Sequence, residues 1–267
     1  MDEFNIYGND FSKVYHRFWY DFIDKIGLKI SNIHQIYNNS PINKMKVLDL
    51  FCGTGRLIKI LSNQGYHVTG LDKSANMLEV ARKNLETEIK ENRITLIKDL
   101  AEEFNLNTNF ELIVSTFDSI NHLDNLELVR SCFSSVYQHL TESGVFIFDM
   151  NTKDELKKWN FIDLEESDDK SIIFIMHGKY VIGEDKAYTR VTGFIDDNHD
   201  GSYKRFDEIM YNSLFNVSDI LKIISDVGFS ECILYSEDLE NIIEKEIVHK
   251  DRVFIVAIKN KKFTRMG

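Results

Sequence analysis

Between Lys46 and Asp149 the chain alternates short apolar runs with longer segments whose apolar residues recur at helical spacing. The short runs predict strands, and the longer segments predict amphipathic helices. The expected strands are 46–50, 67–71, 94–98, 111–115 and 145–149, and the expected helices are 55–64, 75–89 and 124–140. Strands that alternate with helices pair in parallel, so this region predicts an α/β fold with a doubly wound sheet.

The pattern changes after Asn151, where segments rich in β-branched and aromatic residues follow one another without helices between them. These segments, 171–177, 187–195 and 203–214, predict an antiparallel meander. The acidic run 163–169 is typical of a solvated loop. Further on, Ser218 is expected to cap a helix that stops at Gly228, and strands are expected at 230–235 and 252–258.

Residues 10–30 carry aromatic side chains at helical spacing and predict one amphipathic helix that lies over another surface. These patterns divide the chain into four expected parts. They are an N-terminal helical lid at 1–44, a cofactor-binding core at 45–151, an antiparallel insertion at 152–215 and a C-terminal completion of the core sheet at 216–260. The insertion is expected to cover the substrate or to form a dimer surface, because its edge strands would otherwise stay open to pairing.

A glycine turn follows the first expected strand and indicates a ligand that carries a nucleoside. The sequence LDLFCGTG places Asp49 at the strand end and Gly53 and Gly55 in the turn. A dinucleotide site would need the third glycine of G-x-G-x-x-G, and a nucleotide triphosphate site would need a P-loop lysine; neither follows here. Because a carboxylate ahead of the turn would repel a diphosphate but could pair with a cationic group, the turn favours a zwitterionic or sulfonium ligand.

A second acid, Asp72, ends the next strand about 20 residues beyond the turn, which is the spacing of a ribose contact. Lys73 follows it, and Ser74 is expected to cap the next helix. The two acids and the turn would therefore meet one ligand at the carboxyl edge of the sheet.

Taken together, these residues resemble the class I S-adenosylmethionine-dependent methyltransferases, whose first motif usually reads acid-x-G-x-G-x-G. Phe51 departs from the pattern, because the family most often has glycine or alanine at that position. The segment DKSANMLEVAR is similar to the family's D-x-S-x-x-M-L helix start, and FDSINHL followed by GVFIFDMNT suggests the branch that contains sugar-amine N-methyltransferases. The resemblance implies a mostly parallel, Rossmann-like sheet of seven strands, with S-adenosylmethionine as cofactor and S-adenosylhomocysteine as product.

The resemblance also implies roles for individual residues. Met77 is expected at the adenine, and Asp99 beside the adenine amino group. Tyr15 is expected to border the methyl group, and His122, just past the fourth strand, is positioned to act as a base for an amine. Alternatively, Tyr15 is a core residue and His122 binds a loop carbonyl. The cofactor-binding residues expected on this basis are Tyr15, Asp49, Cys52, Gly53, Gly55, Asp72, Lys73, Met77, Asp99, Leu100, Thr116 and Phe117.

Composition narrows the partners. The 267 residues carry a net charge of -11, which disfavours nucleic acid and anionic membranes as partners. Three widely spaced cysteines indicate neither a disulfide framework nor a metal site and fit a reducing, cytoplasmic setting; Cys52 itself is expected to be small and buried. No apolar run reaches the roughly 18 residues of a membrane span. We therefore expect a cytoplasmic enzyme with a small-molecule acceptor, with a homodimer as a further expectation.

The acceptor stays open at this level. The resemblance favours the nitrogen of an amino sugar or a related amine. An oxygen or carbon acceptor is the main rival, because this fold does not determine the nucleophile. A protein that binds S-adenosylmethionine without turnover is the alternative from another functional class.

Overall fold

The computed structural model describes residues 7–38, 41–43, 45–244 and 251–260. Among these residues a seven-stranded sheet has the order β10-β11-β5-β4-β1-β2-β3. Strands β1 to β5 pair in parallel, whereas β11 runs antiparallel to both β5 and β10. The expected seven-stranded, mostly parallel sheet is confirmed. Its strands are β1 (Lys46–Leu50), β2 (His67–Asp72), β3 (Ile94–Lys98), β4 (Phe110–Ser115), β5 (Leu140–Asn151), β10 (Glu231–Tyr235) and β11 (Arg252–Ile258).

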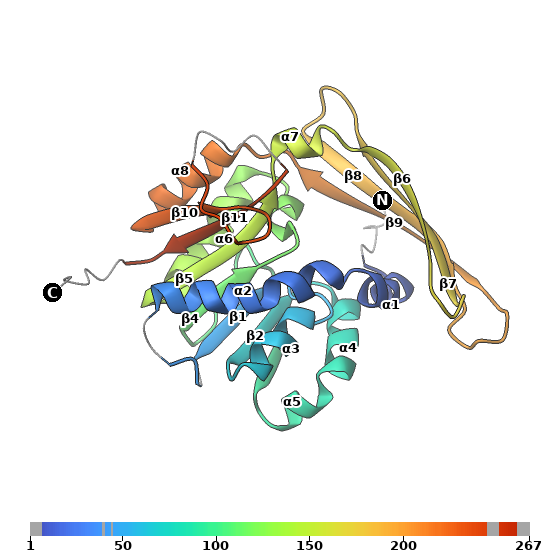
Figure 1. The fold of residues 1–267 in the computed structure, drawn as a ribbon, viewed down its shortest axis with the longest axis horizontal. Helices are drawn as coiled ribbons and strands as arrows, with labels where there is room; N and C mark the ends of the chain where they lie inside the picture. Colours follow the sequence, from blue (N-terminus) through green and yellow to red (C-terminus); the bar gives the residue numbers. More distant parts are fainter. Residues whose placement is uncertain (1–6, 39–40, 44, 245–250, 261–267) are drawn as a thin grey trace.

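Helices cover both faces of this sheet (Figure 1). One face carries α2 (Asp21–Tyr37), α3 (Arg56–Asn63) and α4 (Ala75–Asn84), which is followed by the short α5 (Glu86–Lys90). The other face carries α6 (Leu126–His139) and α8 (Val217–Val227). The central strands are apolar along their whole length because both of their faces are buried.

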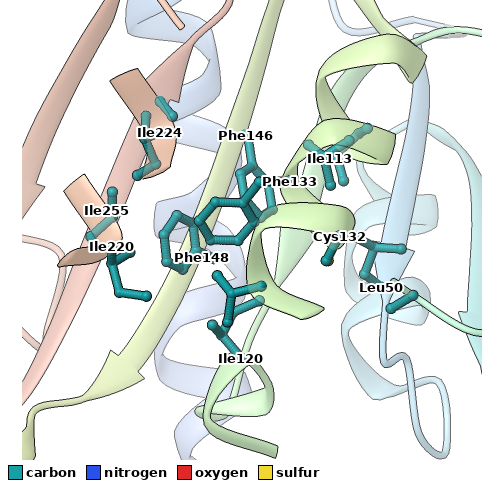
Figure 2. Close-up of a cluster of buried hydrophobic side chains, with 14 of the residues drawn as sticks. Leu50, Ile113, Ile120, Cys132, Phe133, Phe146, Phe148, Ile220, Ile224 and Ile255 are labelled. Atoms are coloured by element: carbon teal, nitrogen blue, oxygen red, sulfur yellow. The ribbon is translucent and has the colours of Figure 1, made fainter. Parts of the chain in front are cut away.

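The core between the sheet and α6 is aromatic. Phe133 of α6 meets Phe146 and Phe148 of β5, with ring centroids 5.4 and 5.0 Å away. Figure 2 shows these rings together with Ile220 and Ile224, which α8 brings to the same cluster. Within the described ranges, no helix is both long enough and apolar enough to cross a membrane.

A second sheet with the order β6-β7-β8-β9 stands beside the first, and all of its strands pair antiparallel. It comprises β6 (Asn160–Glu166), β7 (Ile172–Tyr180), β8 (Lys186–Ile195) and β9 (Lys204–Ser213), after the short helix α7 (Lys153–Leu156). The prediction that 163–169 is a loop is wrong for residues 163–166, which belong to β6. An edge strand whose side chains are mostly exposed tolerates acidic residues, so its charge pattern is that of a loop.

The expected single helix at 10–30 is also wrong, because the chain forms α1 (Asn9–Phe18) and α2 with a turn between them. The two helices pack on different surfaces. Phe11 and Val14 of α1 join a cluster with the second sheet, whereas Ile26 and Ile30 of α2 join the core of the first sheet. A straight helix could not cover both surfaces, so the chain turns at residues 19–20 (Figure 1).

Three smaller expectations also met a test. Ser74 caps α4 by accepting a hydrogen bond from the amide of Met77 at 3.3 Å, which confirms that prediction. The predicted helix 75–89 is interrupted at Leu85, which is fully buried against the first core. Ser218 is not a cap, since α8 begins one residue earlier, after Asn216.

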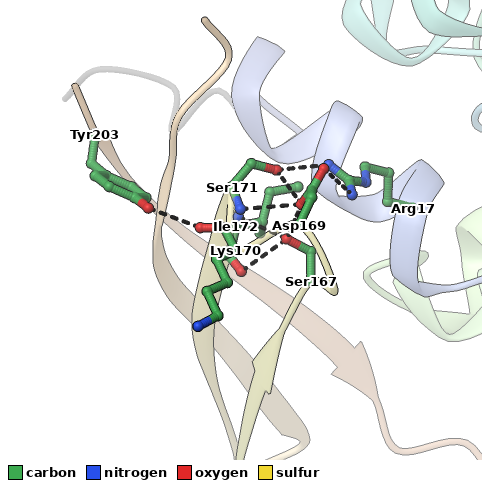
Figure 3. A network of polar contacts seen from close by, with 7 residues as sticks. All are labelled: Arg17, Ser167, Asp169, Lys170, Ser171, Ile172 and Tyr203. Atoms are coloured by element: carbon green, nitrogen blue, oxygen red, sulfur yellow. Dashed lines mark hydrogen bonds and ion pairs between the residues drawn. The ribbon is translucent and has the colours of Figure 1, made fainter. Parts of the chain in front are cut away.

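A polar network fastens α1 to the far end of the second sheet (Figure 3). Arg17 donates hydrogen bonds to the hydroxyl of Ser171 at 2.9 Å and to the carboxylate of Asp169 at 3.0 Å. Asp169 also accepts hydrogen bonds from the hydroxyls of Ser167 and Ser171, and these donors hold its pKa below its usual range. The hairpin between β6 and β7 is thereby fixed over the N-terminal helix.

A buried ionic group joins the ends of β4, β5 and β11. Arg252 donates to Asp118 at 2.7 Å and to Asp149, and Asp118 also accepts a hydrogen bond at 2.7 Å from Asn212 of β9. The guanidinium lies over the rings of Phe22 and Phe117. Burial raises the pKa of Asp149 to about 6, against the lowering effect of Arg252. Because a buried charge without its partner is costly, this group should dominate the stability of the region.

We predict that Arg252→Met lowers the free energy of unfolding by about 3 to 5 kcal/mol, since it leaves buried carboxylates without their cation. Without the guanidinium the pKa of Asp149 in the folded state rises further above the usual 3.8. The folded variant then takes up a proton at a pH where the unfolded chain does not, so the loss should be larger at about pH 8 than at about pH 5. Urea denaturation at the two pH values measures both effects.

Arg190→Met is the matched control, because Arg190 also pairs with a carboxylate, that of Asp207, but its own side chain is 48% exposed. We expect it to cost about 0 to 1 kcal/mol. An equal loss in the two variants, or a loss in Arg252→Met that does not change with pH, would contradict the account of the buried group.

Candidate functional site

A cavity of about 370 Å³ lies at the carboxyl edge of the first sheet, where the second sheet and α1 face that edge. Seven of the residues predicted from sequence lie on its wall: Tyr15, Gly53, Asp72, Lys73, Met77, Phe117 and His122. The other six, Asp49, Cys52, Gly55, Asp99, Leu100 and Thr116, are not among the lining residues. The fold therefore brings about half of the predicted set to one cavity.

The glycine turn owes its sequence to its backbone. Gly53 and Gly55 have φ values of +51° and +79°, and Phe51 also adopts a left-handed conformation at +58°. A Cβ at Gly55 would lie 2.6 Å from Cδ1 of Leu85, so this glycine lets α3 pack closely. A Cβ at Gly53 would meet only Tyr15, at 3.8 Å, because Gly53 faces the cavity. The left-handed backbone explains why Phe51 is an unusual residue at its position, and its side chain both lines the cavity and packs on the core.

Asp72 is held in place by backbone amides. Its Oδ2 accepts a hydrogen bond from the Gly53 amide at 2.8 Å, and its Oδ1 accepts one from the Ser74 amide at 2.8 Å. Burial raises the pKa of Asp72, while these amides and the nearby charge of Lys73 act in the opposite direction. The carboxylate is thus pre-oriented at the cavity wall, with lone pairs left for a further donor.

Asp49 lies at the end of β1 and is only 2% exposed. Within the described part of the chain, its carboxylate has no hydrogen-bond or ion-pair partner. Burial raises its pKa well above the usual value, and the charge of Asp72 adds to the effect. A buried acid of this kind gains strongly from a cation placed next to it.

The remaining predicted residues outside the wall have local partners. Cys52 is buried, and burial raises the pKa of its thiol well above the usual range, so it is unsuited to act as a nucleophile. Asp99 accepts a hydrogen bond from the Leu100 amide at 2.9 Å. The Thr116 carbonyl accepts a hydrogen bond from the Ser119 hydroxyl at 2.7 Å.

His122 ends the 3₁₀ helix η1 (Ser119–His122) and faces the cavity. Its Nδ1 lies 2.9 Å from the carbonyl oxygen of Tyr211 on β9. A carbonyl can only accept, so Nδ1 carries the hydrogen, and the neutral ring has its lone pair on Nε2. The two readings of His122 made from sequence therefore hold together, because one nitrogen binds a carbonyl while the ring lines the cavity.

Two tyrosines extend the aromatic wall. Tyr15 stacks on Trp19 with ring centroids 5.6 Å apart. Tyr7 meets the rings of Tyr15 and His122 edge to face, at 6.4 and 6.5 Å. Burial raises the pKa of both phenols, so both stay neutral hydrogen-bonding groups at physiological pH. Glu208 of β9 holds the backbone at this point by accepting from the amides of Tyr7 and Gly8.

Sequence analysis missed Tyr7, Asp118, Asn212 and Arg252, all of which line the cavity. One signal was present, because Asp149 interrupts the otherwise apolar run FIFDM and a buried acid needs a partner. Arg252, at the start of the final apolar strand, is that partner. No comparable signal marked Tyr7 or Asn212, whose positions depend on how the second sheet and α1 pack.

Comparison with known proteins agrees with this geometry. Residues 47–144, which span the glycine turn and strands β2 to β4, match the family described as a methyltransferase domain. A protein of Geobacillus sp. (strain WCH70) that is named as a methyltransferase is 27% identical over 214 residues, which cover 80% of this chain and 84% of the relative.

Solved structures show the same fold. The structure of an S-adenosylmethionine-dependent methyltransferase from Clostridium acetobutylicum ATCC 824 is similar with a TM-score of 0.76 and 23% identity, covering 94% of this chain and 98% of the other. A sugar N-methyltransferase from Streptoalloteichus sp. ATCC 53650 is similar with a TM-score of 0.72 and 15% identity, covering 94% and 92%. With its methyltransferase domain match, its methyltransferase-named relatives and this fold, the protein is an S-adenosylmethionine-dependent methyltransferase of class I.

Proposed function

We propose that the protein transfers a methyl group from S-adenosylmethionine to the nitrogen of a small amine inside the cavity between the two sheets. The observation that carries the proposal is the orientation of His122. Its Nδ1 is fixed on the carbonyl of Tyr211, so its Nε2 can accept a proton from an amine in the cavity.

The residues at the glycine turn fit the cofactor. Asp49 is a buried acid without a partner in the described part of the chain, and it would gain from the cationic amino group of the cofactor. Asp72 has lone pairs left for the ribose hydroxyls, and the open side of Gly53 leaves room for the backbone to approach. Met77 and Phe117 offer apolar contacts on the wall. Contacts of Asp99, Leu100, Thr116 and Lys73 with the cofactor stay predictions.

The chemistry asks the protein for alignment and for a dry environment. The bound cofactor supplies the methyl group on a sulfonium that is already a strong electrophile. Tyr7 and Tyr15 border the space between the glycine turn and His122, where they limit the approach of an acceptor and exclude water. The amine must attack as a neutral base, and His122 is placed to take its proton.

Nitrogen is favoured over oxygen or carbon by the charge of the site. Four carboxylates line the cavity, those of Asp72, Glu102, Asp118 and Asp124, and an acidic cavity concentrates cationic amines. The fold of a sugar N-methyltransferase agrees with this choice. The proposal is tested by incubating the protein and S-adenosylmethionine with panels of amines, phenols and activated carbon acids, and identifying the methylated atom by mass spectrometry. Methylation confined to oxygen or carbon would refute it.

We predict that Asp72→Ala weakens binding of S-adenosylhomocysteine by about 1 to 3 kcal/mol, because a buried donor on the ribose loses its acceptor. Isothermal titration calorimetry measures the change. Glu79→Ala removes an exposed carboxylate from the neighbouring helix α4 and serves as control, with affinity expected to stay at the wild-type value. If Asp72→Ala bound the ligand as tightly as this control, the assignment of Asp72 would fail.

We predict that His122→Ala lowers kcat by about 10²- to 10⁴-fold, the range of a lost general base, while affinity for S-adenosylhomocysteine stays close to wild type. His67→Ala, which changes an exposed histidine at the start of β2, should leave kcat unchanged. Steady-state kinetics with an accepted amine and calorimetry with the product separate the two quantities. Full activity in His122→Ala would exclude this histidine as the base.

A further inference from the structure

The second sheet supplies an uncharged wall to the cavity. Phe161, Met176 and Met210 line it from β6, β7 and β9, and Trp159 lines it from the segment just before β6. The rings of Trp159 and Phe161 meet edge to face at 5.9 Å. Thr189 of β8, which is only 7% exposed, is the polar neighbour of Met210 in the register. An acceptor that enters the cavity therefore meets sulfur, ring and methyl groups on this side.

This wall is built into the sheet. Phe161 pairs with Gly178 across β6 and β7, and a Cβ on Gly178 would lie 2.1 Å from the Phe161 ring. Only glycine at this position lets the ring lie flat across the strand. The aromatic surface thus depends on a specific cross-strand pair.

The charges on the remaining wall are mostly negative. Among the lining residues described, Lys73 and Arg252 are basic, apart from His122. Arg252 is already paired with Asp118 and Asp149. Lys73 is exposed and follows Asp72, the residue proposed to bind the ribose. Neither side chain is free to meet an anionic group of the acceptor.

We infer that the acceptor is an amine flanked by an apolar or aromatic group, that it carries no phosphate, and that the second sheet is the surface that selects it. This inference rests on the proposed function of the cavity. A phosphate in this space would lose its water shell without gaining a cation and would face carboxylates such as Glu102 and Asp118. An ammonium group on an apolar body is attracted by the same carboxylates and packs against Phe161 and Met210.

Matched pairs of acceptors test the inference. Tyramine and tyramine O-phosphate share amine and ring but differ in one phosphate, and a free amino sugar and its nucleotide-diphosphate conjugate form a second pair. For each pair, kcat/KM is measured with S-adenosylmethionine, and ternary binding is measured on the protein loaded with S-adenosylhomocysteine. We expect the phosphate-free member to be favoured at least about tenfold in both measurements.

A variant pair tests the role of the wall itself. Met210→Lys places a cation on the sheet side of the cavity, and it should narrow the preference for tyramine over tyramine phosphate by about tenfold or more. Met210→Leu keeps the wall apolar and should leave the preference as in wild type. Circular dichroism and affinity for S-adenosylhomocysteine establish that both variants are folded.

The outcomes separate the two claims. Methylation of amines with the phosphate-free members preferred, and a narrowed preference in Met210→Lys, supports the inference. Methylation of amines with equal or greater preference for the phosphorylated members overturns it while leaving the proposed function intact. An unchanged preference in Met210→Lys removes the sheet as the selecting surface. No methylation of any amine, while S-adenosylhomocysteine binds, overturns the inference and the proposed function together.

Discussion

The site depends on one buried guanidinium. Arg252 belongs to the last strand of the first sheet, and its two carboxylate partners come from the end of β4 and from β5. Through Asp118 the group also reaches Asn212 of the second sheet. Phe117 and Asp118 both have positive φ values, of 66° and 46°, which few side chains adopt unless the surroundings hold them there. The ion pairs with Arg252 are what hold them, and the same residues form the floor of the cavity.

Fixing this floor also fixes the base of the second sheet. The inserted segment leaves the first sheet at Asn151 and returns at Ser213, and the side-chain amide of Asn121 donates to the carbonyls of both residues. At the far end, Arg17 of α1 binds the hairpin that precedes β7. A sheet pinned at two ends presents its wall at a defined distance from the glycine turn. That is the condition for aligning an acceptor with a methyl group, where an error of about 1 Å costs rate steeply.

Sequence predicted what depends on local pattern and left out what depends on packing. The turn with Gly53 and Gly55, and Asp72 at its fixed spacing, follow from backbone constraints that are written into consecutive residues. By contrast, the break between α1 and α2 carries no proline or glycine at residues 19–20 and reflects only the two surfaces on which the helices pack. Strand β6 looked like a loop because an exposed edge strand need not show an apolar face. Arg252 and Asn212 join the site from positions far along the chain, and no local pattern marks such a meeting.

The electrostatics of the cavity set two demands that oppose each other. Acidic walls attract a cationic amine, as they attract the cationic cofactor, yet two cations side by side repel and a protonated amine has no lone pair for attack. The acceptor must therefore lose its proton after it has entered, at a point where the proton has somewhere to go. His122 sits on that wall with Nδ1 committed to a carbonyl, so only Nε2 can take the proton. The apolar wall of the second sheet reinforces the step, since a less hydrated ammonium gives up its charge more readily. Charge would then draw the acceptor in, and desolvation against Phe161 and Met210 would help convert it into a nucleophile.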